Sequence, residues 1–175
     1  MTLPNGDYIE LENKVVQTLN QDSQPCGIRE TENPAVALIE AGIRDEPKMY
    51  AKNELPAVAV CATGKTEQFE PNAKTIGKTF HLALLVIHRG ADREQVENLV
   101  KKITARLEEI VRSQTGTESQ FCGLPQQIHN AQGVLIATIS QTSFTAQKSP
   151  TVNMDYTVTA EIKADLWIPI HMDIQ

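Results

Sequence analysis

The stretch FHLALLVI at residues 80–87 is apolar at both its odd and its even positions, apart from His81. The stretch LPAVAVCA at residues 55–62 has the same character. A strand with one face in water alternates apolar and polar residues, so runs like these indicate strands that are buried on both sides. We therefore expect two central strands of a sheet, covered by helices.

Two amphipathic helices are predicted around these strands. The first spans about residues 7–20, where Asp7 and Glu10 have the spacing of a capping box. The second spans about residues 92–112 and begins with a similar pair, Asp92 and Gln95. Its apolar residues form one stripe that we expect to lie on the sheet: Val96, Leu99, Val100, Ile103, Leu107, Ile110 and Val111.

Shorter elements are predicted between the first helix and the second central strand. Residues 26–32 fit a short strand. Residues 34–41 fit a short helix, with Pro34 at its first position and Gly42 at its end. Residues 63–78 are polar and longer than a usual hairpin loop, which suggests either a functional arm or mobility.

Two strands are predicted at the C-terminal end, at about 134–144 and 156–168. The second alternates cleanly and would be about 40 Å long at roughly 3.3 Å per residue, so it could overhang its own sheet. The step around residues 92–112 could place two parallel strands side by side. The predicted fold is α/β (α+β): one domain over residues 1–175, with one mixed, mainly antiparallel sheet packed against an N-terminal helix and one long central helix.

Composition narrows the classes of function. The net charge is −6 and 22% of the residues are charged, which is typical of a globular protein. An acidic chain is a poor candidate for DNA or an anionic membrane surface. The longest apolar run, Leu82 to Ile87, is too short to span a bilayer, and the first residues do not look like a signal peptide. Three widely spaced cysteines favour a reduced cytosolic setting.

Motifs for chemistry were tested against the context that each one needs. Gly-Lys-Thr occurs at 64–66 and 77–79, but a phosphate-binding loop would need glycine where Ala59 and Asn72 stand. A lysine-bearing loop is the better interpretation of both copies.

The histidines and cysteines have no spacing that indicates a site. His81 and His88 are seven residues apart on one predicted strand and should face opposite sides, so they cannot share a metal ion from that strand. No nucleophile signature such as G-x-S-x-G is present. We therefore assign no catalytic, metal or cofactor-binding residues, and expect a binding or assembly role and no enzyme activity.

The order of elements resembles a known family. After the first helix come GIRE at 27–30 and LPAVAV at 55–60, then a polar arm, a strand ending VIHRG at 86–90, a helix opening DRE at 92–94, and two terminal strands. This chain is similar to the tail terminator, or tail-completion, proteins of tailed bacteriophages and prophages. The resemblance implies an α/β fold with a mixed sheet, and a homohexameric ring that caps the tail tube and joins it to the head connector.

The resemblance also implies partners and a location. The partners would be further copies of the chain, the tail tube protein, a head–tail connector or neck protein, and possibly a sheath. No membrane, no specific nucleic acid and no cofactor are implied. The protein would lie in the tail or neck of the virion after assembly in the host cytoplasm.

Two surfaces are candidates for these contacts. The long last strand could add to a neighbouring subunit, because a ring needs heterologous contacts that close. Its candidate interface residues are Tyr156, Val158, Glu161, Lys163, Asp165 and Trp167. The arm could contact the tube or its lumen through Lys65, Lys74 and Lys78. A mobile hairpin tip without a partner explains the arm equally well.

Two other classes stay open from the sequence. One is another neck or head-completion protein with nearly the same fold. The other is a small α/β enzyme or ligand-binding module with an unrecognised site.

Overall fold

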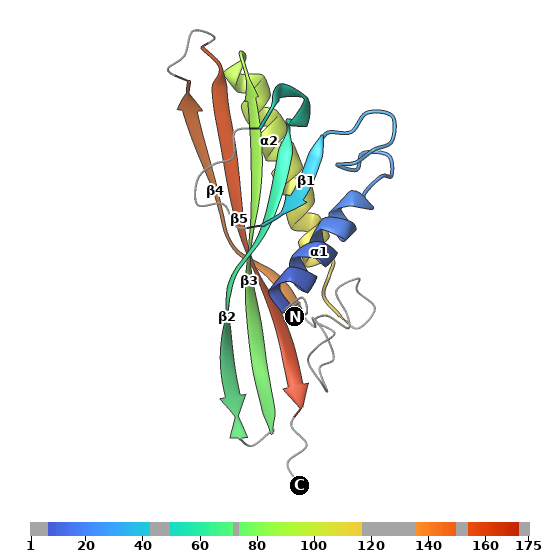
Figure 1. The fold of residues 1–175 in the computed structure, drawn as a ribbon, viewed down its shortest axis with the longest axis vertical. Helices are drawn as coiled ribbons and strands as arrows, with labels where there is room; N and C mark the ends of the chain where they lie inside the picture. Colours follow the sequence, from blue (N-terminus) through green and yellow to red (C-terminus); the bar gives the residue numbers. More distant parts are fainter. Residues whose placement is uncertain (1–6, 43–49, 72–73, 117–135, 150–153, 172–175) are drawn as a thin grey trace, which may run out of the picture.

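The computed structural model describes residues 7–42, 50–71, 74–116, 136–149 and 154–171. Within these ranges the chain forms two α-helices, five strands and a short 3-10 helix (Figure 1). In chain order they are α1 (Asp7–Asn20), β1 (Leu38–Ala41), η1 (Lys52–Glu54), β2 (Ala57–Glu70), β3 (Thr75–Gly90), α2 (Arg93–Arg112), β4 (Ile136–Lys148) and β5 (Tyr156–His171).

The five strands form one mixed sheet in the order β1-β2-β3-β5-β4. β1 pairs with β2 in parallel, and every other pairing is antiparallel. The sheet is mixed and mainly antiparallel, as predicted, but the parallel pair is not the expected one. β5 lies between β3 and β4, so the two strands joined by α2 run in the same direction without being neighbours.

Both helices pack on the same face of the sheet. Leu11 and Val15 of α1 and Val100, Ile103 and Leu107 of α2 belong to one buried core cluster, shared with the residues of β2, β3 and β5 that point to this face. The opposite face carries no helix in the described part of the chain (Figure 1). The expectation that helices cover the central strands is therefore right for one face only.

The first half of β2 is buried on the other face as well. Ala57 and Ala59 are at most 1% exposed, and Tyr50, which is 4% exposed, donates its hydroxyl to Glu40 of the neighbouring β1. Glu40 pairs with Ala59 in the parallel ladder. Tyr50, in the segment before β2, therefore helps to cover the first half of β2 on the helix-free face.

The predicted polar linker 63–78 is largely strand. β2 continues to Glu70 and β3 begins at Thr75, so the two strands form one long hairpin with a register shift between Ala62 and Gly64. The polar residues were expected to form a loop because they lack an apolar face, but ladder hydrogen bonds satisfy their backbone without one. We call the part of the hairpin beyond this shift, Thr63–Glu70 and Thr75–His81, the arm.

The predictions of a short strand and a short helix before β2 are wrong. Residues 26–32 form bends and turns, in which Arg29 donates to the carbonyls of Val36 and Ala37. Residues 34–41 contain the strand β1 in place of a helix. Four residues of parallel pairing with β2 determine this conformation, and the local apolar spacing cannot reveal such a pairing.

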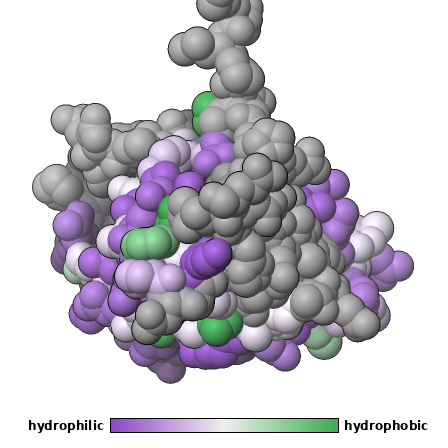
Figure 2. Space-filling model, turned by 90° about the horizontal axis from the view of Figure 1, so that it is seen from below, coloured by the Kyte–Doolittle hydropathy of each residue, from purple (hydrophilic) through white to green (hydrophobic). Residues whose placement is uncertain are grey.

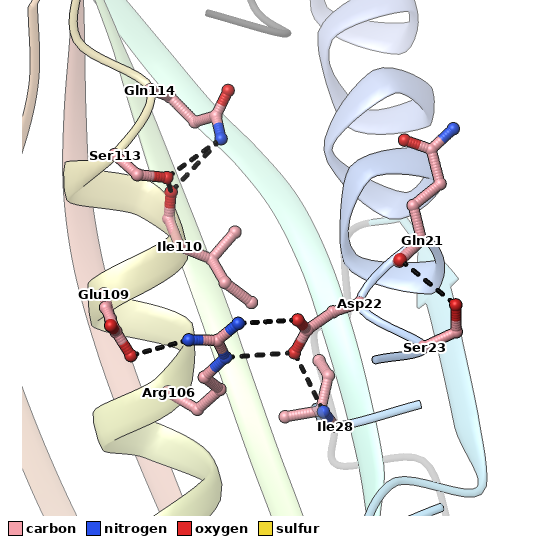
Figure 3. Close-up of polar contacts among 9 residues, drawn as sticks. All are labelled: Gln21, Asp22, Ser23, Ile28, Arg106, Glu109, Ile110, Ser113 and Gln114. Atoms are coloured by element: carbon pink, nitrogen blue, oxygen red, sulfur yellow. Dashed lines mark hydrogen bonds and ion pairs between the residues drawn. The ribbon is translucent and has the colours of Figure 1, made fainter. Parts of the chain in front are cut away.

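The two longer helices agree with the prediction. The Asp92 carboxylate accepts hydrogen bonds from the backbone N–H groups of Glu94 and Gln95, which caps α2. An ion pair then fixes α2 against the turn after α1. Arg106 donates to Asp22 through Nε at 3.1 Å and through Nη2 at 2.7 Å, and Asp22 also accepts from the Ile28 N–H at 2.8 Å (Figure 3).

Candidate assembly surfaces

The predicted interface strand, β5, lies inside the sheet (Figure 1). Its residues pair with β3 along the whole strand and with β4 from Tyr156 to Trp167. A strand can add to a neighbouring subunit only through an edge whose N–H and C=O groups are unpaired. Strand addition through β5 is therefore wrong over residues 156–167, because both edges are occupied there.

The overhang of β5 is short. Within the described residues, the part of β5 beyond Trp167 pairs with β3 only, since the described part of β4 begins at Ile136, opposite Trp167. Removing the residues after Lys163 would delete Leu166 and Ile168, which are both 0% exposed. Such a truncation would damage the core and could not test an interface.

The side chains of β5 divide as the alternation predicted. The even-numbered residues from Val158 to Ile168 are at most 1% exposed and belong to the core under the helices. Val158 therefore offers no surface for a partner, which corrects its place among the candidate interface residues. Glu161, Lys163, Asp165 and Trp167 point to the helix-free face and keep accessible surface, and Tyr156 is half-buried at the start of the strand.

Two of the three candidate arm lysines share one carboxylate. Lys65 and Lys78 both contact Glu67 Oε1, at 2.7 Å and 3.3 Å. The hydrogen bond to Glu67 raises the pKa of Lys65, and hydrogen bonds from the two lysines lower the pKa of Glu67. The Lys78–Glu67 pair therefore links the two strands of the arm, and Glu67 offsets one of the two lysine charges.

The third lysine lies at the turn of the hairpin. Lys74 is exposed and has φ 47, which is left-handed backbone. Of the three predicted contact lysines, it is the one whose ammonium the structure leaves available at the far end of the arm.

Side chains fix the arm where it leaves the core. The Glu12 carboxylate of α1 accepts from the Ala62 N–H at 2.8 Å, immediately before the register shift. His81 Nδ1 and Asp165 Oδ1 are 2.6 Å apart, so the arm is bonded to β5 across the sheet. His81 is thus half-buried with its ring partnered, and the arm is a braced extension of the sheet.

The surface of the arm is mixed in polarity. Every residue from Thr66 to Glu70 is exposed, including Phe69 at 52%. Seen from below, the described surface is mainly hydrophilic with separate hydrophobic residues (Figure 2). Where described residues are visible in this view, the hydrophobic ones lie among hydrophilic ones.

The sequence did not single out β4 as a surface. β4 is the last strand of the sheet and pairs only with β5 among the described residues. Its residues from Ser143 to Lys148 are all exposed, including Phe144 at 46%. One feature of the sequence could have indicated this surface: residues 136–147 contain no charged residue, proline or glycine.

The described residues of the sequence motifs considered for catalysis or metal binding do not come together in a site. Both Gly-Lys-Thr copies lie within strands, 64–66 in β2 and 77–79 in β3, and neither leads into a helix as a phosphate-binding loop must. His81 and His88 lie on opposite faces of β3. In the described ranges no three His, Cys, Asp or Glu side chains come together as metal ligands would. The predictions that concern Cys122, His129 and most of 113–133 lie outside these ranges.

Comparison with protein-family models finds no match, and comparison with curated proteins finds none either. Among solved structures, one chain described as the virion of a native gene transfer agent particle aligns with 91% of this chain and 95% of its own length. The identity is 12% and the TM-score is 0.47. Similarity at this level assigns no role to this chain. In the described residues, neither α1 nor α2 has the length and hydropathy that crossing a membrane requires.

Proposed function

We propose that this chain is a structural protein of a phage or prophage tail that acts as a tail terminator. Copies of it would form a six-membered ring that caps the tail tube and joins it to the head connector. The role depends on shape and on contacts between proteins, and no bond is made or broken.

The projecting arm is the observation that carries the proposal. β2 and β3 extend with the end of β5 beyond both helices (Figure 1). Phe80 at the base of the arm belongs to the core, but the other described arm residues are exposed or half-buried and add little to it. Glu12, Asp165 and the Lys65–Glu67–Lys78 set nevertheless contact the arm. A braced projection is suited to contact a partner, and the arm would meet the tube protein.

The ring is tested first by mass and shape. The purified chain is examined by native mass spectrometry and by negative-stain electron microscopy, where six-fold rings are expected. The cognate tube protein is then polymerised with and without the chain, and the chain should stop tube growth at a fixed length. Unchanged tube growth in the presence of excess chain contradicts the terminator role.

The arm contact is tested by charge. Lys74→Glu reverses the exposed charge at the turn, and Lys102→Glu makes the same change on the exposed side of α2. Weaker tube binding by Lys74→Glu alone supports the contact. Equal binding by both variants favours a hairpin tip without a partner. If the chain is a compact monomer that neither self-associates nor binds the tube protein, the result would favour the alternative of a small α/β enzyme or ligand-binding module.

A further inference from the structure

Two long stretches of sheet edge, of eight residues each, have no partner strand in the described part of the chain. The first is residues 63–70 of β2, which we call the arm edge. β1 pairs only with residues 57–60, and the Glu12 carboxylate takes the next available N–H at Ala62, so the arm edge begins directly after this cap. The second is residues 141–148 of β4, the β4 edge, which begins after the register shift at Ser140.

From Gln141 to Gln147, the β4 edge has none of the charges, prolines or bulges that keep sheet edges apart. Natural edge strands carry charges, proline, bulges or covering segments, because an open edge is a template for another strand. From Gln141 to Gln147 this strand has no charge and no proline, and its one register shift lies before it. Seven uncharged residues of uninterrupted strand are long enough to pair with a strand of similar length.

The geometry points to strand addition between copies of this chain, in which the arm edge of one copy pairs with the β4 edge of the next. This inference rests on the proposed self-assembly and specifies its contact. It also moves the subunit contact from the interior strand β5 to the two boundaries of the sheet.

Strand directions favour this pairing. β2 runs antiparallel to β3, β3 to β5 and β5 to β4, so β2 and β4 run in opposite directions within one copy. The two edges lie at opposite ends of the sheet, the arm edge level with residues 165–171 of β5 and the β4 edge level with residues 156–163. When two copies stand in the same orientation and one is shifted along the strands, the arm edge of one therefore meets the β4 edge of the other as an antiparallel pair. The joint sheet continues the dominant pattern of each subunit.

Side chains at the two edges are compatible. The arm edge carries Lys65, Glu67 and Glu70, for a balance of −1, and the β4 edge carries Lys148 alone, for a balance of +1. Each edge also has one exposed phenylalanine on the helix side of its sheet, Phe69 and Phe144. Antiparallel pairing of two copies in the same orientation places the Phe69 ring of one copy and the Phe144 ring of the other on the same side of the joint sheet.

Because the two edges belong to different strands, the contact is heterologous. Each copy offers an arm edge and accepts one on its β4 edge, so the contact can repeat from copy to copy, and the proposed ring forms where the rotation between copies closes. Pairing of one β4 edge with another would be isologous and would stop at a dimer. The two arrangements therefore differ in the assemblies that edge variants can form.

The experiment uses full-length variants that add two carboxylates to one edge. Thr145→Asp with Gln147→Asp alters the β4 edge, and Thr66→Asp with Gln68→Asp alters the arm edge; all four positions are exposed. Aspartate is depleted in strands and adds repulsion next to the partner, so each variant should weaken self-association by at least about tenfold. Asn98→Asp with Ala105→Asp adds the same charge to the exposed surface of α2 and should assemble as the wild type does.

The decisive step mixes the two edge variants. Each keeps one intact edge of the opposite kind, so the mixture should give a 1:1 dimer by native mass spectrometry while each variant alone stays monomeric. The inference is overturned by a wild-type chain that is monomeric at millimolar concentration, by a β4-edge variant that assembles like wild type, or by a mixture without the dimer. The 1:1 dimer is expected even if the rings are not six-fold or tube growth is unaffected. The edge-to-edge contact and the tail terminator role can therefore fail separately.

Discussion

The ion pair between Asp22 and Arg106 links the turn after α1 to α2, and the cost of its removal can be estimated from its contacts. Asp22→Ala deletes two hydrogen bonds from the guanidinium and one from the Ile28 N–H. In this variant Arg106 keeps its ion pair with Glu109. Because Arg106 is partly exposed, water replaces part of the hydrogen bonding that it loses with Asp22. Ile28 is 2% exposed, and its N–H would lose its partner.

These losses together predict a destabilisation of about 2–4 kcal/mol: about 1–2 for the half-exposed ion pair and about 1–2 for the buried N–H. Urea denaturation at pH 7, followed by circular dichroism, measures the free energy of unfolding. The matched control is Glu109→Ala, which removes the exposed contact of the same guanidinium and should cost at most about 0.5 kcal/mol. A loss below about 0.5 kcal/mol for Asp22→Ala would refute the reasoning.

The same pair predicts a pH dependence. The Arg106 guanidinium holds the pKa of the Asp22 carboxyl below its ordinary value of 3.8, with the Ile28 N–H adding to this and burial opposing it. A carboxyl with a lowered folded-state pKa stabilises fully above its unfolded pKa, and the stabilisation is lost as the pH falls through the folded value. The difference in stability between wild type and Asp22→Ala should therefore be constant above about pH 5 and shrink below pH 3.8.

Three further predictions concern single positions. Asp92→Ala removes the cap of α2 and should lower the free energy of unfolding by about 1 kcal/mol in the same urea assay, whereas Asp92→Asn should retain most of it. Burial lowers the pKa of His88 below 6.5, so wild-type stability should fall as the pH drops below that value, and His88→Phe should remove this slope; an unchanged slope would contradict it. Gly77→Ala places a Cβ 2.8 Å from the Trp167 indole nitrogen, so the fluorescence of this sole tryptophan should shift, and an identical spectrum would show that the ring does not cover Gly77.

The elements that the sequence predicted correctly are those that local signals determine. α2 has a cap at Asp92 and an unbroken apolar stripe, and β5 alternates from Thr157 to Ile168. β1 could not be predicted in the same way, because its four residues form a strand only by pairing with β2, which lies far along the chain. The arm was missed as strand because its residues are polar and are held as strand by the backbone ladder between β2 and β3, which composition does not reveal.

The candidate site shows a different limit of sequence reasoning. Alternation in β5 reveals two faces, and the structure confirms the burial of the even-numbered one. Alternation cannot reveal which strands lie on either side, and the position of β5 between β3 and β4 removes it as a strand donor. The absence of charge over residues 136–147 was visible beforehand, but it gains meaning only when β4 is known to be an edge.

The distribution of charge over the last two strands runs against the usual protection of a sheet boundary. Glu161, Lys163 and Asp165 lie on the interior strand β5, where the neighbouring strands already exclude any addition. The boundary strand β4 has its only charge at Lys148, the last residue. A chain that had to remain monomeric would gain from the opposite distribution, because charges at the boundary prevent edge-to-edge association. The arrangement is consistent with a boundary that another strand covers in the assembled protein, and it makes the Thr145 and Gln147 positions the sensitive place to test that idea.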